Sequence, residues 1–581
     1  MKSRRWIFWL FLIVGSLAVL SVMGAYFVVQ SLRMVPAEVR SGSTLALDLT
    51  GELPEHELFD LGGAFVEYQS VTFRDVLDSV QRAKEDSRID NLLLHFRGTG
   101  LGWAQAEEIR GALLDVSNGG KPVVAFLEYG GTLDYYLASA ADTIYMHPQS
   151  ILDLRGLAAQ VTFLKSTLDK LGIEAEFEQI GAYKNAPDIF TRESLSEPHR
   201  ESLQAMVDDL YGRLVDSIAT SRGLTTSEVE GILDRGPFRA DQARELGLID
   251  QLLYKDEVED LLAESGDDYQ SLSVAAYRAR REDGLSLGRR PTIALIYGVG
   301  IIVGGQSDED PLFGRVMGAD TVASAFRQVR EDSSVDAVVF RIQSPGGSDV
   351  ASDVIWREAA LTREEKPVVV SMADVAASGG YWIATASDAI VAEPSTLTGS
   401  IGIYAGKFNV DGLYQKIGFN RDGVLRGESA DFWSDARSFT PEERLRLRGI
   451  LEAGYERFLE KVAESRNMDR DEVDAVGQGR VWTGAQALEV GLVDYLGGLD
   501  RAITVAKEKA EIAPDSRVNL EVYPESGTLF DMLWKQMIRA NPGITSVHAR
   551  LPERLLSESV VLKLLIEKPS LALMPYDLKV R

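Results

Sequence analysis

Residues 366–403 read KPVVVSMADVAASGGYWIATASDAIVAEPSTLTGSIGI. The short β-branched run Val368–Val370 predicts a buried strand. A turn of small residues follows at Ala376–Gly380, and the run Tyr381–Ser387 predicts a helix packed tightly against a neighbour. Ser378 therefore lies at a strand-to-helix turn, where the N–H groups and dipole of a helix N-terminus stabilise negative charge. This place suits a serine that attacks a carbonyl group and creates an oxyanion. A structural interpretation stays open, in which the glycines merely permit close backbone approach.

The composition excludes several classes of function. The 581 residues suffice for three or four average domains, and a hydrophobic content of 45% allows a sizeable core. A formal net charge of −27 argues against nucleic acid as a partner, since phosphates would be repelled. The absence of cysteine removes disulfides, thiol catalysis and cysteine-ligated zinc. No pair of histidines has metal-ligand spacing such as HExxH, so no metal is expected. The five histidines are His56, His95, His147, His199 and His548.

The N-terminus predicts a membrane anchor within residues 1–30. Trp6–Val29 is an uncharged, largely apolar run long enough to cross a bilayer. The basic flank Met1–Arg5 precedes it, and acidic residues dominate after Val35, so the positive-inside rule places the body outside the cytoplasm. A cleaved signal peptide is the alternative. The length of the run and the lack of an Ala-x-Ala site favour a retained anchor.

The chain contains an internal repeat with an offset of 244 to 246 residues. Tyr135–Ile144 (YYLASAADTI) matches Tyr381–Ile390 (YWIATASDAI), and similar matches run through both halves. One ancestral domain is therefore expected twice, at about 45–265 and 290–510, with a polar link between the copies. Residues 511–581 form a C-terminal extension without a counterpart in the first copy.

Each copy predicts an α/β domain with mostly parallel strands, because short apolar runs alternate with amphipathic segments. In the first copy one helical face carries Leu203, Val207, Leu210, Leu214 and Ile218. In the second copy the corresponding face carries Leu451, Tyr455, Phe458 and Val462.

The differences between the copies indicate the chemistry. At the position of Ser378 the first copy has Thr132, followed by Leu133-Asp134 in place of two glycines. The second copy has Ser344-Pro345-Gly346-Gly347, a turn that can aim N–H groups at a substrate oxygen, where the first has Gly98-Thr99-Gly100-Leu101. Conversely, Gly181-Ala182-Tyr183-Lys184 of the first copy corresponds to Gly427-Glu428-Ser429-Ala430. One copy offers a serine without a lysine, and the other a lysine without a serine.

A nucleophilic serine needs a base, and two kinds are available. His95 or His147 would give a Ser–His–Asp arrangement, but both belong to the first copy. Lys184 would serve if burial depressed its pKa towards neutrality. Ser400, in Thr398-Gly399-Ser400-Ile401-Gly402, could hold the neutral amine by a hydrogen bond or could be a structural hydroxyl of a tight turn.

These motifs together resemble the signal peptide peptidase A family, also called the protease IV family, in its long, duplicated bacterial form. The resemblance covers nearly the whole chain, including the closing Met574–Leu578. It implies a Clp-protease/crotonase-like fold in each repeat, a Ser–Lys dyad and no cofactor. It also implies that Ser378 is the nucleophile, Lys184 the general base and Ser400 the residue that orients the lysine. Gly347 and Gly379 fall where oxyanion-hole amides are expected.

The resemblance further implies hydrolysis of signal peptides left in the membrane after their release. It implies a homo-oligomer, with a tetramer as the expected form, shaped like a bowl over the bacterial inner membrane, with the catalytic body on the periplasmic side. Two other functions remain open. A cytosolic acyl-CoA enzyme on the same fold would need an oxyanion hole but no serine–lysine pair. A membrane scaffold with vestigial catalytic residues would need neither, and retention of both halves of the dyad argues against it.

Overall fold

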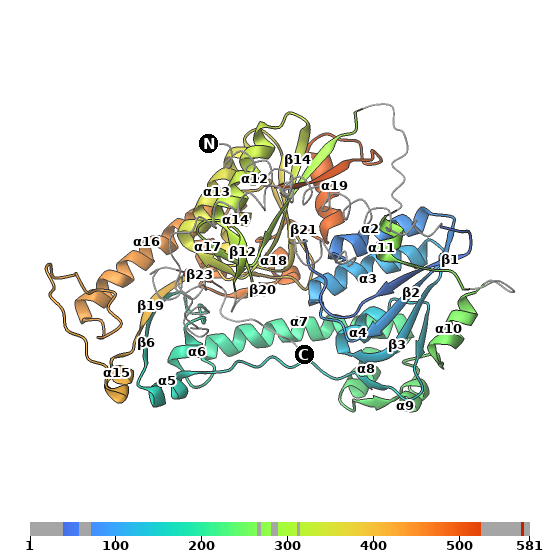
Figure 1. Cartoon of the computed structure of the whole chain (residues 1–581), viewed down its shortest axis with the longest axis horizontal. Coiled ribbons are helices and arrows are strands. Elements are labelled where there is room, and N and C mark those ends of the chain that lie inside the picture. The colour runs from blue at the N-terminus through green and yellow to red at the C-terminus, as the bar shows by residue number, and fades with distance from the viewer. Residues whose placement is uncertain are drawn as a thin grey trace, which may run out of the picture.

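The computed structural model describes residues 39–56, 71–263, 269–279, 289–310 and 314–524, and the backbone of 571–573. Two α/β halves lie side by side (Figure 1). The expected anchor Trp6–Val29 and most of the 511–581 extension lie outside these residues. No helix within the described part of the chain has the length and apolarity required to cross a membrane.

The first half is built on an eight-stranded sheet in the order β7-β5-β3-β2-β1-β9, with β4 and β8 beside β3. All neighbouring strands in this sheet pair in parallel, except that β5 and β7 pair antiparallel with each other. The strands are β1 (Ser43–Asp48), β2 (Ile89–Arg97), β3 (Val123–Gly131), β4 (Thr143–Met146), β5 (Ile151–Asp153), β7 (Phe238–Arg239), β8 (Gln251–Leu252) and β9 (Ser271–Ser273). The helices are α2 (Phe73–Glu85), α3 (Trp103–Asn118), α4 (Thr132–Ala138), α5 (Lys165–Leu171), α6 (Asp188–Thr191), α7 (Glu197–Arg222), α8 (Thr226–Leu233), α9 (Ala240–Glu245), α10 (Lys255–Leu262) and α11 (Val274–Arg278).

The second half repeats this topology strand for strand, in the order β20-β18-β16-β14-β10-β22 with β17 and β21 beside β16. The strands are β10 (Thr292–Val299), β14 (Val335–Ser344), β16 (Val368–Ala377), β17 (Ala389–Ala392), β18 (Leu397–Gly399), β20 (Val481–Thr483), β21 (Tyr495–Leu496) and β22 (Asn519–Tyr523). The helices are α12 (Ala319–Glu331), α13 (Asp349–Arg363), α14 (Gly379–Ala384), α15 (Asp411–Ile417), α16 (Pro441–Arg466), α17 (Arg470–Val476), α18 (Gly484–Glu489) and α19 (Leu499–Lys509). The expectation of a duplicated α/β chain with mostly parallel strands is therefore confirmed. Each copy extends one strand beyond the expected bounds of 45–265 and 290–510, because β22 pairs with β10 as β9 pairs with β1, so the start of the 511–581 segment does have a counterpart in the first copy.

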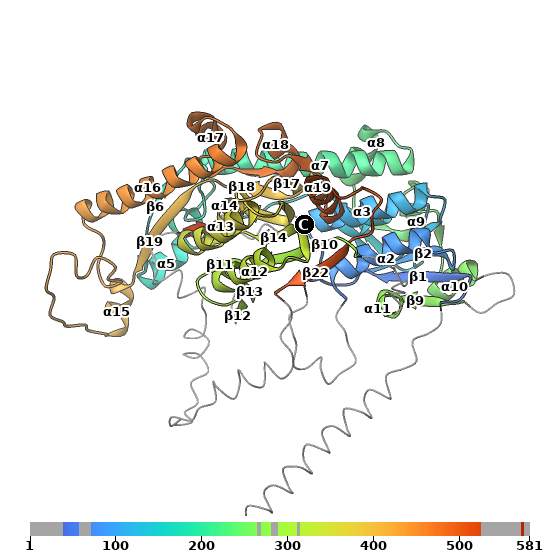
Figure 2. The same ribbon diagram turned by 90° about the horizontal axis from the view of Figure 1, so that it is seen from above.

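The two longest helices, α7 and α16, hold equivalent places in the two halves. Ser196 caps α7 and Thr440 caps α16, each by accepting from the backbone N–H three residues on, and a proline follows in the first turn. Each helix ends at a residue with positive φ, Gly223 or Asn467. Both helices lie along one edge of the molecule in Figure 2.

A third sheet joins the halves. Its order is β12-β13-β11-β15-β23-β19-β6. These strands are β6 (Glu174–Ile180), β11 (Ile301–Val303), β12 (Asp308–Asp310), β13 (Gly314–Gly318), β15 (Gly346–Ser348), β19 (Ile403–Asn409) and β23 (Leu571–Leu573). β6 of the first half pairs antiparallel with β19 of the second over seven residues. The segment that follows β6 is thereby carried across to the second half.

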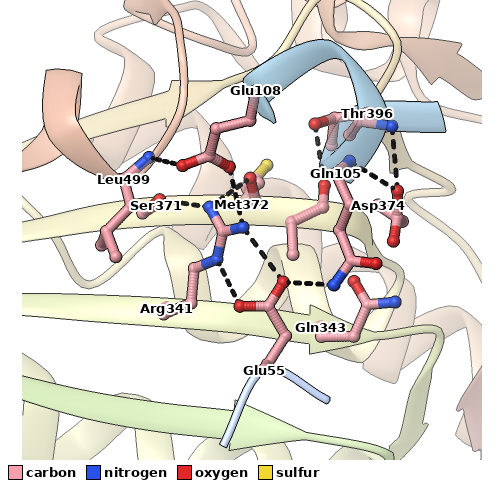
Figure 3. A network of polar contacts seen from close by, with 12 residues as sticks. Glu55, Gln105, Glu108, Arg341, Gln343, Ser371, Met372, Asp374, Thr396 and Leu499 are labelled. Atoms are coloured by element: carbon pink, nitrogen blue, oxygen red, sulfur yellow. Dashed lines mark hydrogen bonds and ion pairs between the residues drawn. The ribbon is translucent and has the colours of Figure 1, made fainter. Parts of the chain in front are cut away.

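A buried charge network also holds the halves together (Figure 3). Arg341 of β14 is fully buried and donates to Glu55 at 3.0 Å and to Glu108 at 2.9 Å, both carboxylates of the first half. Nearby, Asp374 of β16 accepts from the N–H groups of Ala104 and Gln105 at the start of α3. These bonds fix the first half against the strand that leads to Ser378.

Candidate active site

The turn that carries Ser378 is held in an unusual backbone conformation. Ser378 has φ of 56° and ψ of −114° and lies between β16 and α14. Such a conformation is costly for a residue with a side chain. Hydrogen bonds on both sides hold it, from Ser378 N–H to Gly399 O at 2.8 Å and from Trp382 N–H to Ser378 O at 2.8 Å. Gly380 is required here, because a Cβ atom would lie 2.7 Å from Ser344 O.

Lys184 reaches this turn from the end of β6. Gly181 has φ of 108°, and a Cβ atom there would lie 2.5 Å from the backbone of Gln478. Gly479 is equally constrained, because its Cβ would lie 2.5 Å from Lys184 N. Tyr183 N–H also donates to Gln478 O at 2.7 Å. The two glycines therefore let the backbone before Lys184 press against the 478–479 loop of the other half.

The serine and the lysine are in contact within one chain. Lys184 Nζ lies 2.7 Å from Ser378 Oγ, 3.0 Å from Ser400 O and 3.1 Å from Ser400 Oγ. All three residues are fully buried. Among the described residues, the amine contacts hydroxyl and carbonyl oxygens and no carboxylate. Burial without a counter-charge holds the pKa of Lys184 well below its ordinary value of 10.5.

Ser400 is placed by its own tight turn. It has φ of 50°, and its N–H donates to Arg480 O at 2.7 Å. This turn follows β18 and presents the carbonyl and the hydroxyl of Ser400 to the same amine. A neutral amine that donates to Ser400 keeps a lone pair free for the proton of Ser378.

The two glycines expected at an oxyanion hole lie in two different elements. Gly379 is the first residue of α14, where backbone N–H groups lack helical partners. Gly347 lies in β15, and a Cβ atom there would lie 2.1 Å from Ile302 O. β23 pairs antiparallel with β15, and its neighbour on the other side is β19. An extended segment of the chain itself thus lies beside Gly347.

The histidines that could have served as bases lie elsewhere. His95 Nε2 contacts Glu128 Oε2 at 2.9 Å in the first half. The ring of His147 meets the ring of Tyr254 edge to face, with centroids 5.2 Å apart. Within the part of the chain described, neither ring contacts Ser378.

The turn at Thr132 differs from the equivalent turn at Ser378, because Thr132 begins α4 with ordinary helical geometry and has no positive φ.

Residues of the 478–480 loop contact the lysine segment, although the sequence analysis did not predict a role for them. Arg480 donates to Glu201 at 2.8 Å, and Tyr183 donates to Glu201 at 2.9 Å. These contacts brace the lysine segment from outside. The available signal was the Gly477-Gln478-Gly479 cluster, which indicates a tight loop but not its partner.

Comparisons with known proteins identify the family of this chain. The model of peptidase family S49 matches residues 116–267 and 360–513. A chloroplastic serine protease SPPA of Arabidopsis thaliana is 36% identical over 507 residues, which cover 85% of this chain and 73% of that protein. Protease 4 of Salmonella typhi is 34% identical over 543 residues, covering 89% and 85%. Protease 4 of Haemophilus influenzae is 31% identical over 505 residues, covering 82% and 81%.

The chain belongs to peptidase family S49. It is therefore a serine peptidase, and the resemblance inferred from its motifs is confirmed. A solved structure of a ClpP1 point mutant from Listeria monocytogenes matches 36% of this chain and 92% of that chain, at 15% identity and a TM-score of 0.24. The Clp-protease/crotonase-like fold of each repeat stays a prediction.

Proposed function

We propose that this chain is a membrane-anchored endopeptidase that hydrolyses cleaved signal peptides and other apolar peptides with a Ser378–Lys184 dyad. The observation that carries the proposal is the 2.7 Å contact between Ser378 Oγ and a fully buried amine without a counter-charge. A lysine in such surroundings is neutral and can act as a base. A purely structural lysine would gain nothing from this burial, because desolvation of its charge is costly.

In the proposed reaction, the neutral amine of Lys184 accepts the proton of Ser378 Oγ as this oxygen attacks the peptide carbonyl. The oxyanion that forms is stabilised by the N–H groups of Gly379 and Gly347. The ammonium group then gives its proton to the leaving amine, which departs and leaves an ester on Ser378. Water hydrolyses the ester with Lys184 again as base. Ser400 orients the amine through both of its oxygen atoms.

The substrate would bind as an added strand beside β15. β15 and β19 are separated by one strand position in the third sheet, and β23 takes that position here. A peptide in the same place would bind mainly through backbone hydrogen bonds, which do not depend on its sequence. Any preference for particular residues would come from pockets that hold its side chains. This mode suits varied apolar peptides.

The proposed location is the bacterial inner membrane, crossed once, with the catalytic body on the periplasmic side. The basic flank and the apolar run of residues 1–29 support this topology. Signal peptides remain in the bilayer after cleavage, so an anchored body would meet them at its surface. Protease added to spheroplasts should digest the body, and full protection with the outer membrane open would contradict this topology.

We also propose a homo-oligomer, for which the internal repeat provides a geometric argument. Within the chain, β6 of the first half pairs with β19 of the second. The equivalents of these strands are 420–426 and 157–163, and neither segment is paired in a sheet within the described residues. Apolar side chains near 420–426 are largely exposed, with Phe419 at 62%, Val424 at 99% and Leu425 at 61%. A second copy can cover them by repeating the β6–β19 pairing between chains.

One experiment separates this proposal from an acyl-CoA enzyme or an inert scaffold. Wild type, Ser378→Ala and Lys184→Ala are compared for hydrolysis of an apolar fluorogenic peptide and for labelling by a fluorophosphonate probe. We expect wild type to do both and both variants to lose hydrolysis, with labelling lost in Ser378→Ala. Thr132→Ala is the matched control, because Thr132 occupies the equivalent turn of the first repeat, and it should keep activity. Wild-type labelling of Ser378→Ala, or substantial turnover by Lys184→Ala, would rule out the dyad.

A further inference from the structure

A large cavity lies where the first repeat would have its own active site. Its volume is ≈ 1190 Å³, and it opens between the two halves. The first half contributes Thr132, Leu133 and Asp134, which correspond to Ser378, Gly379 and Gly380. Thr99–Trp103 also line it, and they correspond to the turn around Gly347. The cavity thus has the position of a peptide-binding site in a fold that binds peptides in its other half.

The chemistry of this position has been removed. Thr132 Oγ1 lies 3.1 Å from Arg155 O and accepts from Arg155 N–H at 3.2 Å, so the hydroxyl is occupied by backbone. The carboxylate of Asp134 accepts from Thr99 N–H at 2.8 Å and from Gly131 N–H at 2.7 Å. The counterpart of Lys184 in the sequence is Ala430. The equivalent of the serine–lysine pair is therefore absent at this position, and a bound peptide would not be cut there.

The cavity comes close to Ser378. Val375 and Leu397 of the second half line it and pair with each other in β16 and β18. Val375 precedes Ser378 by three residues on an extended strand, which corresponds to about 10 Å. A single peptide can therefore place one bond at Ser378 and its flank, a few residues away, in the cavity.

The residues that line the cavity indicate which kind of peptide segment it would bind. Apolar side chains include Leu101, Trp103 and Leu133, and acidic ones include Glu52 and Glu309. Both glutamates are exposed. Glu309 lies directly opposite Arg315 in the β12–β13 pair and interacts with its charge, whereas Glu52 lies on a separate segment of the first half. Of the two arginines that line the cavity, Arg155 is paired with Asp153 at 2.7 Å, and Arg315 donates to His56 O at 2.6 Å.

The apolar surface and the excess of carboxylates together match a peptide segment with apolar residues next to lysine or arginine.

We propose that this cavity is an exosite, which holds the apolar and cationic flank of a peptide while the neighbouring bond is cleaved at Ser378. The inference rests on the proposed peptidase function and extends it, because it gives the inactive repeat a role in substrate choice. The first repeat then contributes to one reaction in two ways. Its Lys184 belongs to the dyad, and its inactive site binds the part of the peptide next to the cleaved bond.

The test compares two fluorogenic peptides with the same apolar core, one flanked by two lysines and one by two glutamines. The full-length protein carries either Glu52→Gln with Glu309→Gln, or the matched control Glu230→Gln with Glu245→Gln on the exposed surfaces of α8 and α9. We expect wild type and the control to have a lower KM for the lysine peptide. In the Glu52/Glu309 variant this preference should fall by about fivefold, with kcat unchanged, as expected for two exposed charge pairs. The same loss should follow from adding salt to about 0.5 M in wild type.

A peptide truncated before the flank is the second control, and its KM should be the same in all variants. A lysine preference that is equal in the Glu52/Glu309 variant and in wild type would overturn the exosite. If wild type cleaves no peptide, the proposed function fails, and the exosite is still tested by fluorescence anisotropy of the two labelled peptides bound to Ser378→Ala. Equal affinity for both peptides in that measurement would also overturn it.

Discussion

At the scale of single residues, the proposed mechanism depends on the neutral form of Lys184. Lys184 contacts the oxygens of Ser378 and Ser400 and is shielded from water. Its pKa is lowered by burial, so the neutral form that a base requires is available at lower pH than for an exposed lysine. The same burial must cost stability, since the amine of the unfolded chain is protonated and hydrated.

The pH dependence of catalysis should report Lys184 directly. The base is active when neutral, so kcat/KM should rise with pH through the lowered pKa of Lys184, at lower pH than an ordinary lysine would titrate. Lys184→Arg should be as inactive as Lys184→Ala, because a guanidinium stays charged. Steady-state kinetics across the neutral and alkaline range measure this. A pH-independent profile for wild type would contradict the assignment of Lys184 as base.

Replacement of Lys184 by methionine should stabilise the protein at neutral pH. Between the folded pKa and 10.5, the unfolded chain binds a proton at this position that the folded chain does not, so folding releases it and wild-type stability rises with pH in that window. Lys184→Met has no such proton, and its free energy of unfolding should exceed that of wild type at neutral pH. The gain should shrink as the pH approaches the ordinary pKa of lysine. Urea unfolding at about pH 7 and about pH 9.5 measures both effects. A Lys184→Met variant less stable than wild type at neutral pH would count against a buried neutral amine.

The candidate residues could be predicted from the sequence because the two repeats differ at those positions. Comparison of Ser378 with Thr132, and of Lys184 with Ala430, isolates a serine and a lysine that one copy lacks. The bracing by Gln478 and Gly479 could not be predicted, because it depends on backbone approach between distant segments. The buried Arg341 was equally hidden, since an arginine in sequence is usually exposed and its partners lie in the other half.

At the scale of elements, local patterns predict strands and helices but not the pairing between halves. The apolar run at Val368–Val370 does lie in β16, and the helix predicted over Tyr381–Ser387 is α14, which begins earlier, at Gly379, and ends at Ala384. The pairing of β6 with β19 has no local signal, because the two strands belong to different repeats and β6 carries alternating glutamates typical of an exposed strand. That pairing is nevertheless what brings Lys184 to Ser378.

The position of β23 predicts that the chain competes with its own substrate. Deletion of residues 570–581 removes the strand that pairs with Gly346–Ser348 and should lower KM for peptides severalfold, with kcat unchanged. A synthetic peptide of residues 568–576 should then inhibit the truncated enzyme competitively. Peptide titrations of both forms measure this. An unchanged KM together with no inhibition would show that β23 does not occupy the substrate's place.

At the scale of the whole molecule, the repeat predicts how copies associate. Shifting the β6–β19 register by the repeat offset of 246 residues places Ala159 of one copy opposite Val424 of the next. Directly opposed residues in antiparallel strands are close enough for a disulfide. The variant Ala159→Cys with Val424→Cys should form disulfide-linked oligomers that are visible on non-reducing gels. Because the natural chain has no cysteine, no other disulfide can contribute to these bands. Each single variant is the control, and failure of the double variant to crosslink in an oligomeric preparation would place the interface elsewhere.

The division of the dyad between the halves has a consequence for heredity. A duplicated gene normally keeps a spare, because either copy can lose function while the other works. In the proposed dyad each copy supplies a residue that the other lacks, so activity requires that both be inherited together. We expect the covalent link to be dispensable once the halves have met, because Arg341 and the β6–β19 pairing already join them. Cleavage at a protease site inserted between Ala279 and Arg289 of the folded protein should leave peptidase activity intact, whereas loss of activity on cleavage would show that the link itself aligns the two halves.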